Sequence, residues 1–204
     1  MDELMTSSLR NVCVYCGSAP GDDPRYRAAA EQLGTALAQS GLGLVYGGGN
    51  NGLMGITARA VLQAGGHVTG IIPDFLKGRE LMLREAQDLV VVPDMHTRKR
   101  IMFERADAFV ALPGGVGTLE ELVEQLTWVQ LGRHRKPVLL ADVGGFWRPL
   151  LSLFAHMRDA GFIRPEFEVR YLVAEKIEDV IPMLAKAVDS AARQGASDQL
   201  DPRL

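Results

Sequence analysis

The chain has no long hydrophobic run and no excess of positive charge. Its apolar stretches are interrupted by glycine, proline or charge well before the roughly 20 residues that a membrane helix needs, and its start, Met1-Asp2-Glu3, lacks the basic residues of a signal peptide. The formal net charge of −3 argues against a general nucleic-acid binder, whose affinity depends on clustered lysine and arginine. We therefore expect a cytoplasmic protein with no membrane or nucleic-acid partner, in which any anion site is local.

Cysteine is scarce, and two common nucleotide-binding motifs are missing. Cys13 and Cys16 form one C-x-x-C with no second pair or nearby histidine, so the sequence predicts two reduced thiols beside a buried strand and no metal site. The first predicted strand is followed by Gly17-Ser18-Ala19-Pro20-Gly21 instead of G-x-G-x-x-G, and no lysine follows the glycines before Thr118 as a Walker motif requires. The chain therefore resembles neither a typical dehydrogenase nor a typical NTPase.

What the chain has is a regular alternation of short apolar or β-branched runs with helical patterns. Over 204 residues, 47% of them hydrophobic and 23% charged, this alternation predicts a doubly wound α/β fold, with a mostly parallel, Rossmann-like sheet in a single domain over 11–194 and tails at 1–10 and 195–204. We predict strands near 11–16, 42–46, 67–72, 88–92, 106–112, 137–141 and 170–173. We predict helices over 24–40, 52–65, 95–105, 117–131, 147–160 and 176–193, while the polar crossover 73–87 has no pattern that predicts its structure.

Three glycine-rich loops follow predicted strands, at 16–21, 47–55 and 113–118. In a parallel sheet, ligands bind beyond the carboxyl ends of the strands, so three such loops at one edge favour a broad cleft for a nucleotide-like molecule. The loop at 47–55 is also consistent with a simple tight turn. In the loop at 113–118, glycines permit a sharp turn and a close approach, while the free N–H groups and the dipole of the following helix attract an anion, most simply a phosphate.

Two charged side chains on the helices beside this last loop are candidates for chemistry. Glu121 lies about 60° around the helix axis from Thr118, so both can face one cavity, but Glu121 could equally stabilise the helix dipole, as could Glu120 or Glu124. Arg98 falls in the apolar stripe of the helix 95–105 and needs either a protein carboxylate or an anionic ligand, because burying an unpaired charge is costly. A structural ion pair between two helices and a catalytic pair both fit this spacing. The core stripe predicted for the second helix is Leu119, Leu122, Val123 and Leu126.

Four motifs follow one another along residues 12–180. They are Gly47-Gly48-Gly49 with Gly52-Leu53-Met54-Gly55, then Met95-His96-Thr97-Arg98-Lys99, then Pro113-Gly114-Gly115-Val116-Gly117-Thr118-Leu119-Glu120-Glu121, and finally Thr127-Trp128-Val129-Gln130-Leu131-Gly132 with Lys136-Pro137. In this order they resemble the signature of the Lonely Guy family, the cytokinin riboside 5′-monophosphate phosphoribohydrolases.

The resemblance implies an enzyme that hydrolyses the N-glycosidic bond of a purine riboside 5′-monophosphate, releasing the base and ribose 5-phosphate with no metal and no organic cofactor. It implies that Arg98 and Glu121 are the catalytic pair, and that the protein forms a homodimer or an assembly of dimers through the helical surfaces around Arg98 and Thr127. The substrate-binding residues implied in the same way are Gly17, Ser18, Gly48, Gly49, Glu80, Met95, Lys99, Gly114, Gly115, Val116, Gly117, Thr118, Leu119, Glu120 and Thr127.

Other functions stay open at the level of sequence. One is a general AMP nucleosidase. Another is a non-catalytic carrier of a phosphorylated ligand, such as the molybdenum-cofactor carriers, which look similar in fold and share the glycine loop but would not need Arg98 and Glu121. Similar sequences have also carried the label lysine decarboxylase, but that reaction needs pyridoxal phosphate on a lysine, and no lysine here lies in a convincing apolar pocket. The sequence leaves open whether the natural base is adenine or an N6-prenylated adenine.

Overall fold

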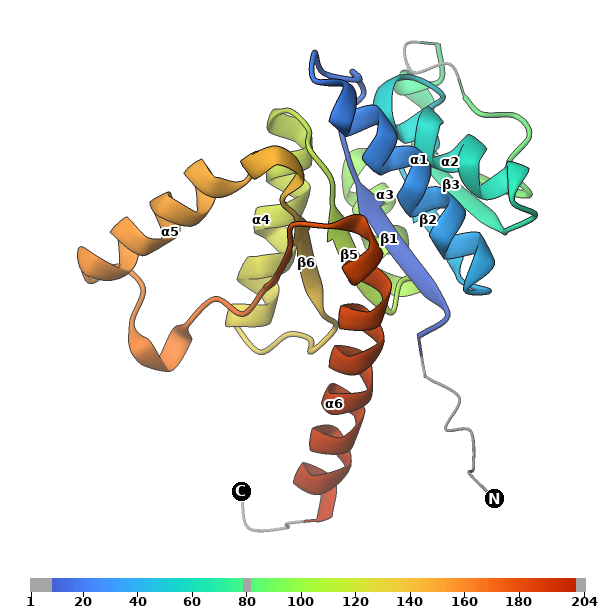
Figure 1. Ribbon diagram of the computed structural model, residues 1–204. Coiled ribbons are helices and arrows are strands. Elements are labelled where there is room, and N and C mark those ends of the chain that lie inside the picture. The colour runs from blue at the N-terminus through green and yellow to red at the C-terminus, as the bar shows by residue number, and fades with distance from the viewer. Residues whose placement is uncertain (1–8, 79–81, 201–204) are drawn as a thin grey trace.

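The computed structural model describes residues 9–78 and 82–200, with side chains up to residue 193, and contains one parallel sheet covered by helices on both faces (Figure 1). The strands are β1 (Asn11–Tyr15), β2 (Gly43–Tyr46), β3 (Val68–Pro73), β4 (Asp88–Val92), β5 (Ala108–Ala111), β6 (Val138–Ala141) and β7 (Leu172–Ala174). Every neighbouring pair is parallel, in the order β4-β3-β2-β1-β5-β6-β7. The predicted doubly wound α/β class is therefore confirmed. The strand order reverses between β1 and β5, which is where such sheets bind ligands.

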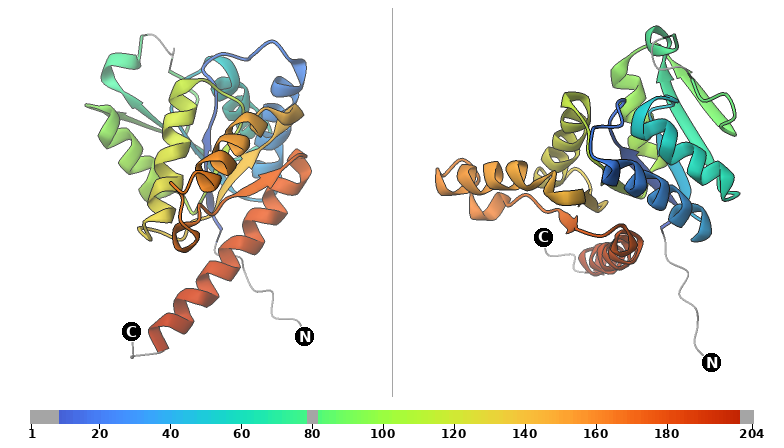
Figure 2. Two further views of the ribbon diagram at one scale, coloured as in Figure 1. Left: turned by 90° about the vertical axis from the view of Figure 1, so that its left-hand side faces the viewer. Right: turned by 45° about the horizontal axis from the view of Figure 1, so that its top comes forward.

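Two helical layers cover the sheet (Figures 1 and 2). The helices are α1 (Pro24–Gln39), α2 (Gly52–Gln63), α3 (Met95–Arg105), α4 (Val116–Gln130), α5 (Arg148–Asp159) and α6 (Val180–Leu200), with single 3-10 turns η1 (Asp74–Leu76), η2 (Val143–Gly145), η3 (Pro165–Phe167) and η4 (Ile177–Asp179). Buried side chains of α1, α2 and α6 join one core cluster, and those of α3, α4 and α5 join the other. Within the described residues, none of these helices combines the length and the apolar character needed to span a bilayer.

The alternation of side chains along β1 separates the two cores. Val12 and Val14 belong to the cluster under α1 and α2, whereas Cys13 and Tyr15 belong to the cluster under α3 and α4. All four are at most 2% exposed. Tyr15 stacks on Phe109 of β5, with ring centroids 5.8 Å apart. The strand at the reversal point thus forms an apolar floor beneath α3 and α4.

The C-terminal helix differs from its prediction over 176–193 at both ends. It begins at Val180, after η4, because the ring of Pro182 would clash with the carbonyl of Glu178 if the α-helix began earlier. It continues to Leu200, so the described part of the expected tail, residues 195–200, is helical. A glycine inside a helix is unfavourable by only about 1 kcal/mol and does not end it. In the crossover 73–87, the structure places η1 and an isolated antiparallel bridge between Gly49 and Met82.

Candidate active site

The three glycine-rich loops meet at the carboxyl edge of the sheet. The N–H of Gly17 donates to the carbonyl of Pro113 over 3.1 Å, and the N–H of Leu53 donates to the carbonyl of Gly17 over 3.0 Å, so the loop after β1 is bonded to both of the others. A Cβ atom on Gly17 would lie 3.3 Å from the Cα of Gly114 and 2.8 Å from the carbonyl oxygen of Ala19. The predicted convergence of the loops is confirmed, and close backbone contact explains the glycine at 17.

The first turn of α4 offers backbone donors to a ligand. Gly115 is its N-cap and supplies no side-chain oxygen, so the first N–H groups of the helix have no partner from a capping side chain. A Cβ built on Gly115 or Gly117 would meet no described atom within 4 Å beyond its chain neighbours and the backbone of its own helix, and Val116 is 84% exposed. Open space in front of free N–H groups at the positive end of a helix fits an anionic group such as a phosphate.

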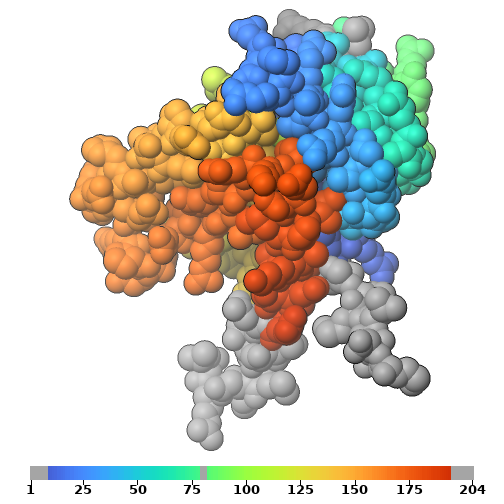
Figure 3. Space-filling model, viewed as in Figure 1, coloured from blue at the N-terminus to red at the C-terminus, as the bar shows by residue number. Residues whose placement is uncertain are grey.

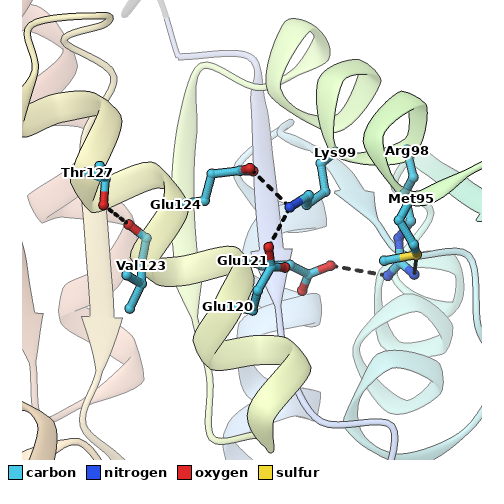
Figure 4. A network of polar contacts seen from close by, with 8 residues as sticks. All are labelled: Met95, Arg98, Lys99, Glu120, Glu121, Val123, Glu124 and Thr127. Atoms are coloured by element: carbon cyan, nitrogen blue, oxygen red, sulfur yellow. Dashed lines mark hydrogen bonds and ion pairs between the residues drawn. The ribbon is translucent and has the colours of Figure 1, made fainter.

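Arg98 of α3 and Glu121 of α4 form a buried ion pair (Figure 4). Nη2 of Arg98 lies 3.3 Å from Oε1 of Glu121, and the two residues are only 5% and 7% exposed. The Asp94 side chain caps α3 by accepting a 2.8 Å hydrogen bond from the N–H of Thr97; this bond holds the pKa of Asp94 below its usual value and fixes the turn that carries Arg98. The sequence predicted that Arg98 needs a partner, and the structure identifies that partner as Glu121.

The guanidinium of Arg98 has N–H donors that contact only a weak acceptor or no described acceptor. Its Nη1 lies 3.9 Å from the thioether sulfur of Met95, a weak acceptor, and its buried Nε has no hydrogen-bond partner among the described residues. Gly47, at the end of β2, makes room for it, because a Cβ atom there would lie 2.1 Å from Nη2. A buried guanidinium with one carboxylate contact is able to bind a further acceptor, as a ligand would supply.

Lys99, the next residue of α3, pairs with the other two acids of α4 (Figure 4). Its Nζ lies 2.5 Å from Oε1 of Glu120 and 3.0 Å from Oε1 of Glu124. Partial burial opposes the charge of Lys99, but these two carboxylates outweigh it and raise the pKa of the ammonium. The three acids that sequence alone could not distinguish are therefore separated: Glu120 and Glu124 serve a surface network, and Glu121 alone faces the buried arginine.

The two cysteines lie beneath the Arg98–Glu121 pair, and their thiols are unreactive. Both are free and buried, which agrees with the predicted reduced thiols. Burial raises the pKa of Cys13 and of Cys16, the charge of Glu121 raises both further, and Arg98 offsets only part of the effect. Thiols in this state remain protonated and are poor nucleophiles and metal ligands. This leaves Arg98 and Glu121 as the candidates for reactive chemistry at this edge.

Other residues implied by the resemblance lie at different distances from the pair. Met95 contacts Arg98, whereas Gly48 lies against Ile71 and Ile72 of β3 and Gly49 forms a bridge to Met82. Ser18 is exposed at the turn after β1. Thr127 lies about two turns beyond Glu121 on α4 and is exposed, with its hydroxyl donating to the carbonyl of Val123 over 2.7 Å (Figure 4), so one chain does not bring it to the ion pair. Glu80 lies outside the described residues.

The predicted core stripe of α4 is wrong in two positions. Leu119 and Val123 are 36% and 38% exposed, whereas Thr118, Glu121 and Gln125 are buried together with Leu122 and Leu126. The helix is rotated so that its polar residues face the sheet, because Arg98 and the glycine turn meet them there. Gly47 and Asp94 were not singled out from the sequence either. Aspartate before a helix is a capping signal that could have indicated Asp94, whereas no sequence pattern links Gly47 to Arg98.

Fold and site together define a class of protein: a doubly wound α/β protein with a glycine-rich helix N-terminus at the reversal point of its sheet and a buried arginine–glutamate pair beside it. A family model described as "Possible lysine decarboxylase" matches residues 54–184. The chain belongs to the family of the cytokinin riboside 5′-monophosphate phosphoribohydrolases. Such an enzyme from Arabidopsis thaliana is 50% identical over 80% of this chain and 75% of its own length. A probable one from Oryza sativa subsp. japonica is 44% identical over 91% of this chain and 79% of its own length.

Solved structures with the same fold include two molybdenum-cofactor proteins. The molybdenum cofactor carrier protein from Chlamydomonas reinhardtii aligns with a TM-score of 0.67 at 22% identity, covering 89% of this chain and 99% of that one. The molybdenum cofactor binding protein from Rippkaea orientalis aligns with a TM-score of 0.66 at 23% identity, covering 88% and 98%. At these identities the likeness establishes the fold alone.

Proposed function

We propose that this chain hydrolyses the N-glycosidic bond of purine riboside 5′-monophosphates and releases the free base and ribose 5-phosphate. The observation that carries the proposal is the buried contact of 3.3 Å between Arg98 and Glu121, next to the glycine turn that begins α4. The relatives at 50% and 44% identity are named for this reaction on cytokinin riboside 5′-monophosphates.

In this reaction the first task is to hold the 5′ end of the nucleotide. The N–H groups at the start of α4, with Gly114, Gly115 and Gly117 around them, would bind the phosphate. Anchoring the phosphate fixes the ribose relative to the side chains of α3 and α4, so that the reaction between the bound nucleotide and these groups becomes effectively unimolecular.

Glu121 and Arg98 would act on the sugar and the leaving base. Cleavage builds positive charge on the ribose, and the Glu121 carboxylate would stabilise this charge or orient the attacking water. The guanidinium of Arg98 lies 3.3 Å from the Glu121 carboxylate and would hold it in place. Its remaining donors would contact the substrate oxygens or the departing purine. Each role places both residues against the substrate, so each predicts a large loss of rate when either side chain is removed.

A homodimer is part of the same proposal. The outward face of α4 presents Val116, Leu119 and Val123, which are 84%, 36% and 38% exposed and lie at helical spacing, with Thr127 following on the same helix. An apolar stripe of this kind is typical of a helix that packs on a partner. Light scattering should give the mass of two chains, or of an assembly of such pairs. A monomer that hydrolyses AMP would contradict the dimer and leave the proposed reaction intact.

The experiment that tests the reaction is incubation of the purified protein with AMP and, separately, with the N6-isopentenyl form of AMP, followed by chromatography of the products. We expect free base from at least one of them, and the ratio of the two rates identifies the preferred base. Glu121→Gln and Arg98→Ala should each lower the rate at least about 10²-fold. Arg100→Ala and Glu104→Gln are matched controls, because these residues form an exposed pair at 3.0 Å on α3 and should change the rate little.

The contrary outcomes separate the reaction from the site. If neither nucleotide is cleaved while another phosphorylated compound stays bound, the protein is a carrier, as the molybdenum cofactor carrier protein from Chlamydomonas reinhardtii is named. If the nucleotides are cleaved but Glu121→Gln and Arg98→Ala react at the normal rate, the reaction stands and the catalytic pair is wrong.

A further inference from the structure

The described part of the chain contains a second concave site, at the amino ends of β6 and β7. It has a volume of about 650 Å³, within the range of small-molecule sites. Its walls are the C-terminal end of α4 with the following loop, the segment 165–172 that includes η3, and α6. Figure 3 shows α6 and the segment that leads into it on one face of the molecule. Because α4 runs from the carboxyl edge of the sheet to its amino edge, this cavity lies at the opposite end of that helix from the glycine turn.

Positive charge collects at this cavity. Arg170 lines it and forms no ion pair within the part of the chain that the structure describes. Lys136 also lines it; its Nζ donates to the carbonyl of Phe103 over 2.7 Å and lies 4.1 Å from the centre of the Phe103 ring. Of the two acids in the lining, Glu168 already faces Arg158 at 3.5 Å, which leaves Glu166. The lining therefore holds three cations, Arg135, Lys136 and Arg170, against two acids, one of which is paired with Arg158.

Part of the remaining lining is apolar, and one wall is held in place. Val129, Pro137, Val138 and Leu172 provide aliphatic surface, and Tyr171 provides an aromatic ring, beside the polar side chains of Gln130, His134 and Ser190. The wall formed by η3 is tied to α4, because Nε2 of Gln130 donates to the carbonyl of Phe167 over 2.6 Å. A cavity that combines apolar surface with cationic groups suits a ligand that has an apolar body and one negative group.

We propose that this cavity is a second ligand site, which binds a small aromatic anion through Arg170 and holds its ring against the apolar part of the lining. The site is separate from the glycine turns and from the Arg98–Glu121 pair. The negative group is a carboxylate, sulfonate or phosphate ester, since a guanidinium binds each of these.

The test uses 8-anilinonaphthalene-1-sulfonate, whose fluorescence rises when its ring system leaves water. The intact protein should bind one probe per chain in a saturable manner. Arg170→Gln should weaken binding about threefold to tenfold, the range for losing one charge-assisted contact near the surface. Arg27→Gln removes an equivalent exposed charge on α1 and should leave the affinity within about twofold.

Filling the cavity gives an independent arm. Ala187→Trp places a large ring in the cavity from α6 and should abolish saturable binding. Ser190→Trp, at an exposed position of the same lining, should have the same effect and provides the test if Ala187→Trp fails to fold. Probe binding that survives Ser190→Trp, or that Arg170→Gln leaves unchanged, overturns the proposal.

Competition identifies what is recognised. Naphthalene-1-carboxylate should displace the probe. Inorganic phosphate lacks an aromatic body, so displacement by phosphate should require at least about a tenfold higher concentration. Saturating AMP should leave the probe bound. If AMP displaces the probe at the concentration at which it occupies the active site, the probe binds at the glycine turns and the proposal fails. If phosphate displaces the probe as effectively as naphthalene-1-carboxylate does, the site does not recognise an aromatic ring.

Discussion

Gly47→Ala is expected to disable the site without unfolding the protein. The added Cβ would lie 2.1 Å from Nη2 of Arg98 and 3.0 Å from its Cζ, with the sulfur of Met54 next at 3.3 Å. Normal contacts of this kind are about 3.5 Å or longer, so the guanidinium has to move by more than about 1 Å. Gly47 has an ordinary backbone conformation and is not among the glycines with positive φ, so alanine adds no backbone strain there. The group that gives way is the end of a flexible side chain.

The expected magnitude follows from the geometry of the pair. Nη2 of Arg98 lies 3.3 Å from Oε1 of Glu121, and moving Nη2 by more than about 1 Å breaks this contact. Misplacing a catalytic group by about 1 Å lowers rates by about 10²-fold. We therefore expect kcat for AMP to fall about 10²-fold in Gly47→Ala, measured by chromatographic release of base, with the urea midpoint of unfolding changed little.

A double-mutant cycle tests whether the effect passes through Arg98. In an Arg98→Ala background the added methyl group meets no guanidinium, so Gly47→Ala should lower the residual rate no further. If Gly47→Ala lowers the rate by the same factor in both backgrounds, or retains full activity in the normal one, the proposed link between Gly47 and Arg98 is refuted.

Two further perturbations test the anion turn and a buried histidine. A Cβ on Gly114 would lie 2.1 Å from Oγ1 of Thr118 and 2.8 Å from the nitrogen of Gly17, so Gly114→Ala should open the turn and raise KM for AMP about tenfold in steady-state assays; an unchanged KM would argue against phosphate binding there. Burial, with the charge of Lys136, lowers the pKa of His134 from 6.5 to about 4, so the unfolded chain binds a proton that the folded chain rejects and stability is lost as the pH falls from 6.5 towards 4. Because His134 is only partly buried, we expect His134→Phe to reduce the loss of unfolding free energy between pH 7 and pH 5 by about 1 kcal/mol in urea titrations, and equal losses would contradict this.

Most of the fold could be predicted from the sequence because each element has a local signal. The strands are short apolar runs with glycine or proline at their ends, and α3 has the bounds 95–105 that were predicted for it. The two ends of α6 were missed for opposite reasons. Pro182 excludes a helix that begins at residue 176 because its ring would clash with the carbonyl of Glu178, one turn earlier. Gly195 is only weakly unfavourable in a helix, and the helix continues beyond it.

The site was harder to predict because its decisive contacts join distant segments. Spacing allowed Glu120, Glu121 or Glu124 to face Arg98. Which of them does so depends on how α4 is rotated about its own axis over the sheet, and the apolar residues of the helix define that rotation only to within one residue position. Leu119 and Val123 entered the predicted stripe because leucine and valine are apolar, although both are partly exposed. An apolar residue on a helix indicates contact with other protein, and the sequence does not say whether that protein is the same chain.

The Arg98–Glu121 pair is better explained by chemistry than by stability. Removing two opposite charges from water is unfavourable, and one contact of 3.3 Å with an unpartnered Nε recovers only part of that loss. Two apolar side chains of similar volume should therefore leave the contact between α3 and α4 as stable as before, or more stable by about 1–4 kcal/mol. We expect the double variant Arg98→Met with Glu121→Leu to unfold at the same or a higher urea concentration while releasing no base from AMP. An ion pair whose role is to join two helices would give a clearly less stable double variant instead.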